Sequence, residues 1–201
     1  EMHIGPIGIV GSSSANTMAS EADVIIAIGT RLQDFTTGSW TSFSRDAKFV
    51  SINTARWDAT KHRACAVVGD ALETIKEINA NIFGTIDGLD GHKKTIELKG
   101  SGIETWSAEK SWTIKGKSEF SNWNNLLTEL QAPTNTTVPS YAQVVGLVND
   151  LAEPEDTLVT AAGGLPGEVS KGWRVKNPHT FDCEFGFSCM GYEIAAGWGH
   201  A

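Results

Sequence analysis

Cysteine is scarce and unevenly spaced: Cys65, Cys183 and Cys189 are the only three among 201 residues. An odd count without a Cys-x-x-Cys pair or paired histidines argues against a disulfide framework and against a zinc site. Cys183 and Cys189 could approach each other, but buried free thiols in a cytosolic protein are the simpler interpretation.

Long apolar runs and excess positive charge are also missing. No stretch of about 18 apolar residues occurs, so no membrane-spanning helix is predicted. The first residues lack a charged segment followed by an apolar run, so we expect no signal peptide and a cytoplasmic location. The net charge of −8 repels phosphate at long range. We therefore expect neither nucleic acid nor a membrane as partner.

Residues 1–83 alternate strand and helix patterns, which predicts an α/β unit with a parallel sheet. The continuous apolar run 23–29 predicts a strand buried on both faces. Further strands are expected at 48–53 and 65–68, and Asp70 is placed to cap a helix that follows. Residues 30–40 are predicted to be a polar loop. Because no Gly-x-Gly-x-x-Gly motif occurs, dinucleotide binding is not expected.

Residues 84–138 carry the weakest patterns and are expected to form a helical connection and linker. Helices are possible at 104–115 and 118–130. Three tryptophans, Trp106, Trp112 and Trp123, suit either ligand stacking or the anchoring of this connection on its neighbours, and anchoring is the ordinary role. The composition of residues 132–140, APTNTTVPS, is typical of a linker.

Residues 139–201 form the most informative region. A short apolar strand at 158–162 ends directly in Gly163 and Gly164, and a second strand, 180–185, is followed by a small-residue turn and a helix. Open α/β sheets bind ligands where neighbouring strands end, and glycines there expose backbone N–H groups to phosphate. From spacing alone, the glycines could equally serve only tight turns.

These motifs carry a resemblance to the thiamine-diphosphate enzymes. SCMGYEIAAGWG resembles the segment where a Gly/Ser-x-(Met or Ile)-Gly-(Phe or Tyr) turn opens the second helix of their diphosphate-binding domain, and TLVTAAGG resembles that domain's first strand and phosphate-side turn. GPIGIVGSSSAN and EADVIIAIGTRLQDFTTGSW resemble the acetolactate-synthase-like central domain. In some relatives this domain holds FAD, but nothing in this sequence argues for FAD.

The resemblance implies a fold and a set of roles. The fold is α/β with two Rossmann-like parallel-sheet units: an acetolactate-synthase-like central domain at 1–83 and a truncated thiamine-diphosphate-binding domain at 139–201. The implied cofactor-binding residues are Gly163 and Gly164 beside the diphosphate, Ser188 through its backbone carbonyl, Cys189 in the same turn, and Met190 as the apolar wedge under the bent cofactor. Without the resemblance, Met190 would be interpreted as an ordinary core residue.

Glu168 and Glu184 are carboxylates near these turns. Either could meet substrate, although a surface or capping role is the more ordinary interpretation for both. We assign no catalytic residue and no metal ligand within this chain. The family's Mg²⁺ motif, Gly-Asp-Gly followed by Asn, is expected beyond Ala201. The activating glutamate is expected in an N-terminal domain and acts from a partner subunit.

Both ends therefore suggest a fragment of a longer enzyme that is inactive by itself. The resemblance implies, for the intact protein, a homodimer or homotetramer that uses thiamine diphosphate and Mg²⁺ to hydrolyse a C–C bond of a cyclic diketone. VTAAGGLPGE and TRLQDFTTGSW favour the ring-opening hydrolases of inositol catabolism within the family. Two alternatives stay open: an acetolactate-synthase-like lyase or decarboxylase, and a non-catalytic α/β ligand-binding module.

Overall fold

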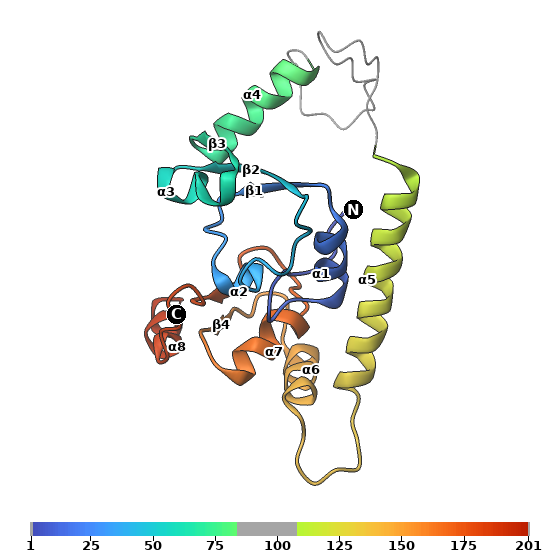
Figure 1. The fold of residues 1–201 in the computed structure, drawn as a ribbon. Helices are drawn as coiled ribbons and strands as arrows, with labels where there is room; N and C mark the ends of the chain where they lie inside the picture. Colours follow the sequence, from blue (N-terminus) through green and yellow to red (C-terminus); the bar gives the residue numbers. More distant parts are fainter. Residues whose placement is uncertain (1, 84–107, 201) are drawn as a thin grey trace. The chain divides into compact units, whose positions relative to one another are not determined.

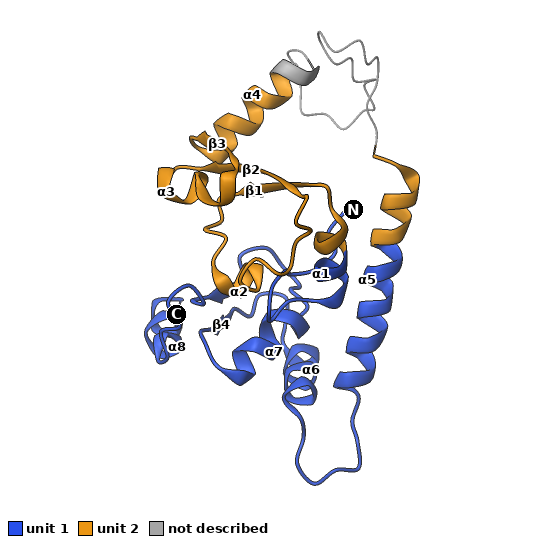
Figure 2. Cartoon of the chain, in the orientation of Figure 1, with its two compact units in different colours: residues 1–17, 117–201 blue, residues 18–116 orange. Residues whose placement is uncertain are grey.

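The computed structural model describes residues 2–83 and 108–200. The chain forms two compact units, shown in different colours in Figure 2. Unit 1 combines residues 1–17 with 117–201, and unit 2 comprises residues 18–116. The domain boundaries expected from the sequence, at 83 and 138, concern family domains and stay a prediction.

Unit 2 contains a three-stranded parallel sheet in the order β1-β2-β3, formed by β1 (Val24–Ile28), β2 (Lys48–Asn53) and β3 (Cys65–Val68). Ile26 pairs with Val50, and Val50 pairs in turn with Cys65. Because the strands are parallel and joined by crossovers, the α/β class expected for this part of the chain is confirmed (Figure 1).

Helices connect these strands. α1 (Ser13–Glu21) precedes β1, α2 (Asp34–Thr37) follows it, α3 (Arg56–Ala59) and the 3₁₀ turn η1 (Lys61–Arg63) lie between β2 and β3, and α4 (Ala71–Phe83) follows β3. The Asp70 carboxylate accepts N–H bonds from Leu72 at 2.9 Å and Glu73 at 3.1 Å, so the predicted cap of α4 is confirmed. The expected polar loop 30–40 is in part helical, because it includes α2.

The prediction that β1 is buried on both faces is wrong for the structure described here. Ala27 is buried, but Ile26 is 61% exposed, and Val24 and Ile28 on the same face are exposed as well. Side chains alternate between the two faces of a strand, and an unbroken apolar run makes both faces equally hydrophobic. The run therefore predicts a strand correctly but does not reveal which face the rest of the unit covers.

Unit 1 contains a two-stranded parallel sheet of β4 (Leu158–Thr160) and β5 (Phe181–Cys183). Its helices are the first part of α1, the C-terminal part of α5 (Lys110–Gln131), then α6 (Tyr141–Leu151), α7 (Gly164–Gly172) and α8 (Tyr192–His200). Ser140 and Gln143 form a capping box at the start of α6: each side chain accepts the other's backbone N–H. The predicted helix–strand–helix–strand–helix order of this region is confirmed.

Glycines allow α5, α6 and α7 to approach closely. A Cβ atom at Gly146 of α6 would lie 2.7 Å from Cβ of Gln131 at the end of α5. The Gln131 amide donates to the carbonyl of Gly172 at the end of α7, at 3.0 Å. One side chain therefore joins all three helices, and only a residue without a Cβ fits opposite it at position 146.

The tryptophans of the connection differ in environment. Trp123 and Leu127 are buried, while Trp112 is partly exposed. Anchoring is thus the role that the structure shows for Trp123, whereas Trp106 lies outside the described residues. Two possible helices were expected here, and the described part forms one, α5, which runs through Gly116.

Among residues 2–83 and 108–200, no helix combines the length and apolar character needed to cross a membrane.

Candidate functional site

The two glycine-containing turns of unit 1 leave the sheet at the same edge. Thr160, the last residue of β4, pairs with Cys183, the last residue of β5. The ladder continues one step further, because the Glu184 N–H donates to the Thr160 carbonyl at 3.0 Å. The turn before α7 and the turn before α8 therefore begin side by side at the carboxyl ends of neighbouring parallel strands, where α/β sheets bind ligands.

The first turn places backbone donors at the start of α7. Gly163 is the N-cap residue and has φ = 134°, a conformation that a residue with a side chain rarely adopts. It supplies no side chain to the helix end, and the first N–H groups of any α-helix have no intrahelical acceptor. A Cβ at Gly164 would lie 3.0 Å from the Tyr141 ring. Both glycines thus meet a conformational or steric need, and no side chain caps the N–H groups of this helix start.

The second turn is held by the Glu184 carboxylate. One of its oxygens accepts the Phe187 N–H and the other accepts the Cys189 N–H, each at 2.9 Å. Between these donors Ser188 has φ = 55°, and Gly191 has φ = 93° at the start of α8. Glu184 therefore has the capping role, and Glu168 pairs instead with Lys171 at 2.8 Å, one turn along α7.

Met190 projects from the same turn and is 84% exposed. A core methionine, the ordinary interpretation from the sequence, is therefore wrong for this chain. Phe187 before it, and Ile194 and Trp198 along α8, are exposed as well. The turn and α8 thus present large apolar side chains outward, next to the hydrogen-bonded backbone of the turn.

Asp182 ties α8 to β5. Its carboxylate accepts the hydroxyl of Tyr192 at 2.8 Å and lies 3.1 Å from Nε2 of His200, so both ends of α8 meet one strand residue. The hydrogen bond from Tyr192, followed by that from His200, lowers the pKa of the Asp182 carboxyl. No sequence motif predicted this cluster. The available signal was the position of a charged residue, Asp182, between two apolar residues of the predicted strand.

Replacing Asp182 by asparagine is expected to change the pH dependence of stability. A carboxyl whose pKa is lower in the folded state stabilises the fold above its unfolded pKa of about 3.9, and this contribution is lost as pH falls through the folded pKa. Asp182→Asn should therefore unfold at lower urea concentration than the wild type at pH 7, and the gap should close below about pH 4.

Tyr192→Phe provides the matched control, because it keeps the carboxylate and removes the hydroxyl that lowers its pKa most. Its loss relative to the wild type should likewise shrink in acid. If the difference in urea midpoint between the wild type and Asp182→Asn stays constant from pH 7 to pH 3, the stabilising role of the Asp182 carboxylate is contradicted.

The three cysteines are free; Cys183 directly precedes the second turn, and Cys189 lies within it. Burial raises the pKa of the Cys183 thiol, and the hydrogen bond to Glu184 raises that of Cys189. Both are therefore less reactive than an ordinary thiol at neutral pH. Among the described residues, no group of three or more His, Cys, Asp or Glu is arranged to hold a metal ion.

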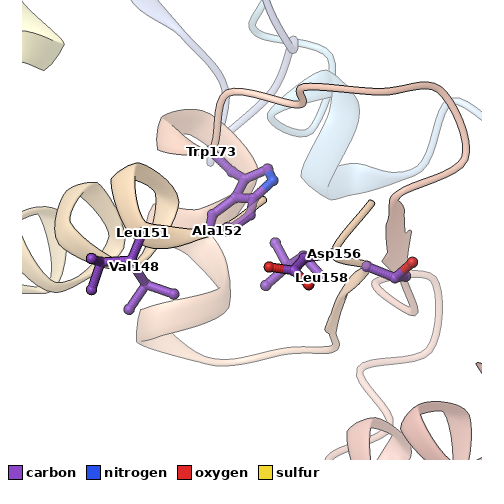
Figure 3. Close-up of a pocket in the computed structure, with 7 residues that line it drawn as sticks. Val148, Leu151, Ala152, Asp156, Leu158 and Trp173 are labelled. Carbon is purple, nitrogen blue, oxygen red and sulfur yellow. The ribbon is translucent and has the colours of Figure 1, made fainter. Parts of the chain in front are cut away.

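A shallow hollow of about 320 Å³ lies at the opposite end of β4 (Figure 3). Trp173, Leu158 and the last turn of α6 line it, together with Asp156. Leu158 is the first residue of the strand, whereas the glycine turns follow its last residue. The hollow is therefore not part of the candidate site.

Comparison with known protein families finds a match in the N-terminal part of the chain. Residues 1–78 match the family "Thiamine pyrophosphate enzyme, central domain". This match covers α1, the three strands of unit 2 and most of α4. The resemblance to thiamine-diphosphate enzymes drawn from the sequence is confirmed.

Individual relatives extend the similarity over nearly the whole chain, and their names are specific. The chain is 33% identical over 207 residues to a protein of Clostridium botulinum (strain Alaska E43 / Type E3) named 3D-(3,5/4)-trihydroxycyclohexane-1,2-dione hydrolase. It is 36% identical over 205 residues to a protein of that name from Listeria innocua serovar 6a. These alignments cover 98% and 96% of the chain but 31% and 30% of the relatives. The chain thus spans about a third of the length of the curated relatives it matches.

The residues present fit one end of thiamine diphosphate, the cofactor that the family implies. The uncapped start of α7 offers N–H groups that suit a diphosphate. An exposed methionine in the neighbouring turn suits an organic ring system. The positions of Gly163, Gly164, Ser188, Cys189 and Met190 around two adjacent strand ends are consistent with the roles predicted for them, which stay predictions.

Proposed function

We propose that the natural protein containing this chain is a hydrolase that depends on thiamine diphosphate and Mg²⁺. Its substrate would be 3D-(3,5/4)-trihydroxycyclohexane-1,2-dione, and C–C cleavage of the ring would give 5-deoxy-glucuronate in inositol catabolism. The relatives' names support the substrate. The structural observation that supports the cofactor is the pair of glycine-containing turns at neighbouring ends of β4 and β5, with Met190 exposed between polar backbone groups.

Each residue of these turns would have a limited task. The N–H groups at Gly164 and Leu165, freed of side-chain caps, would bind the diphosphate. The Ser188 carbonyl would accept the amino group of the pyrimidine ring. Met190 would support the cofactor in its bent form, and Cys189 would fix the spacing between them. When bound, thiamine diphosphate supplies a nucleophilic carbon and an electron sink for C–C cleavage.

Proton transfer and metal binding are expected from other parts of the natural protein. We assign no catalytic residue to this chain, and the Mg²⁺ ligands and the activating glutamate remain predictions for segments outside it. A homodimer or homotetramer in the cytoplasm belongs to the same proposal, since the glutamate would come from the partner subunit.

Isothermal titration with thiamine diphosphate and Mg²⁺ tests the proposal. The natural protein should bind the cofactor and lose affinity when EDTA removes Mg²⁺, whereas the 201-residue chain should bind weakly or not at all. The loaded natural protein should convert the cyclic dione to 5-deoxy-glucuronate.

Two outcomes would replace this proposal with an alternative. Formation of acetolactate from pyruvate, without turnover of the dione, would indicate an acetolactate-synthase-like lyase. If the natural protein does not bind thiamine diphosphate under any of these conditions, a non-catalytic α/β ligand-binding module becomes the better assignment.

A further inference from the structure

The N-terminal loop of unit 1, residues 5–11, is fixed from inside by polar side chains of the helix that follows it. Asn16 of α1 makes two bonds to one residue: its Oδ1 accepts the Gly8 N–H and its Nδ2 donates to the Gly8 carbonyl, both at 2.9 Å. Ser14, whose side chain is fully buried, donates to the Ile4 carbonyl at 2.6 Å. A loop held by this many internal bonds has one defined conformation.

Two glycines show how tightly this loop is closed. Gly5 has φ = 106°, and a Cβ there would lie 2.3 Å from the Ser12 hydroxyl. A Cβ at Gly11 would lie 2.6 Å from the Pro6 carbonyl oxygen. The Ser12 N–H already donates to that same carbonyl at 2.8 Å. The loop is therefore closely packed, and we expect the loss of an internal hydrogen bond to change its conformation.

This loop lies against the first turn of α7. A Cβ at Gly167 would be 3.4 Å from Cγ1 of Val10, so Val10 packs directly on the helix where Gly167 has no side chain. The Gly167 N–H donates to the Gly163 carbonyl at 3.1 Å and closes that first turn. Asn16 therefore holds the loop at Gly8, and Val10 of the same loop packs against the helix turn that carries the candidate diphosphate donors.

We propose that Asn16 is a positioning residue for the diphosphate end of the candidate site. It would not touch the cofactor; it would hold the loop, and the loop would hold the start of α7 in the geometry that binds the diphosphate. The ligand named in this inference rests on the proposed function. The contacts that connect Asn16 with Gly167 are observed in the chain and do not depend on that function.

The chain offers a closely matched control in Asn149 of α6. Its Nδ2 donates to the Arg174 carbonyl at 3.1 Å and its Oδ1 accepts the Arg174 N–H at 3.2 Å, which is the same pair of bonds that Asn16 makes to Gly8. Arg174 lies just beyond the last turn of α7, at the end away from Gly163. Asn16→Ala and Asn149→Ala thus remove the same chemistry from opposite ends of one helix.

The test combines hydrogen exchange with cofactor titration in the natural protein. Asn16→Ala should speed amide exchange of the segment 161–170, and Asn149→Ala should speed it near Arg174 instead. In catalysis, a displacement of about 1 Å in a positioned group can cost about 100-fold in rate. By the same loss of geometry, we expect Asn16→Ala to weaken thiamine diphosphate binding by roughly tenfold or more. Asn149→Ala should change it by less than about threefold, at a similar loss of thermal stability.

The outcomes separate this inference from the proposed function. If the wild type binds thiamine diphosphate and Asn16→Ala binds it as well as Asn149→Ala does, the positioning role is wrong. Unchanged exchange of the segment 161–170 in Asn16→Ala would overturn it independently of any ligand. If the wild type does not bind thiamine diphosphate, the proposed function is wrong. Asn16 then cannot position a site for this cofactor either.

Discussion

Replacing Gly11 by alanine is expected to lower the free energy of unfolding by about 2–3 kcal/mol, the upper range for overpacking a well-filled site. The added Cβ would lie 2.6 Å from both the Pro6 carbonyl oxygen and the Ile7 carbonyl carbon, and 2.7 Å from the Gly8 nitrogen. All three are backbone atoms, so no side chain can rotate away. The loop would have to open, which breaks the bonds from the Gly11 N–H to Gly8 and from the Ser12 N–H to Pro6.

Gly197→Ala is the matched control for this substitution. A Cβ at Gly197, inside α8, meets nothing within 4 Å. Alanine is favoured over glycine in a helix interior by about 0.5–1 kcal/mol, so this variant should be as stable as the wild type or slightly more stable. Urea denaturation of the two variants beside the wild type measures both effects. A Gly11→Ala midpoint equal to that of Gly197→Ala would show that the loop is not closed as described.

Replacing Glu184 by alanine is expected to weaken thiamine diphosphate binding by roughly tenfold to 100-fold in the natural protein, by analogy with the loss seen when the hydrogen-bond partners that orient metal ligands are replaced. The carboxylate joins the N–H groups of Phe187 and Cys189 across Ser188. The left-handed conformation costs a residue with a side chain about 1–2 kcal/mol of conformational free energy. Without the two hydrogen bonds to the carboxylate, this cost for Ser188 is no longer offset. The turn would relax, and the Ser188 carbonyl and Met190 would leave their positions.

Glu168→Ala separates this effect from a simple loss of negative charge. Glu168 lies in α7, the helix that follows the first turn, and its ion pair with Lys171 is partly exposed. Such pairs contribute about 0–1 kcal/mol, so Glu168→Ala should bind the cofactor within about threefold of the wild type. Isothermal titration compares the two variants, and circular dichroism checks that both are folded. Equal affinities for Glu184→Ala and Glu168→Ala would exclude a role for the carboxylate in the turn.

Continuous apolar runs made the sheets predictable. The strands expected at 48–53 and 65–68 match β2 and β3 at both ends, because each run is bounded by polar or turn residues. The glycines after β4 were also recognisable, since few other residues satisfy the backbone there. Local pattern was sufficient wherever the determining residues are close in the sequence.

Features that depend on tertiary contacts were not predictable. Asn16 meets Gly8 across a loop, and nothing in the order of residues distinguishes it from an ordinary helix asparagine. The exposed face of β1 and the outward position of Met190 depend on which elements pack nearby, as does the meeting of Tyr192 and His200 at Asp182. Sequence spacing located the turns of the candidate site, and the structure added the side chains that hold them.

The left-handed conformation of Ser188 has a consequence for how this turn can vary between proteins. At φ = 55°, glycine is accommodated without strain, asparagine and aspartate with little, and β-branched residues poorly. Because the proposed contact at this position is a backbone carbonyl, a change between serine and glycine alters the side chain but leaves the binding group in place. Alternation of these two residues at the first position of the motif is therefore what its backbone permits, and a valine or isoleucine there would mark a protein in which the turn has a different shape.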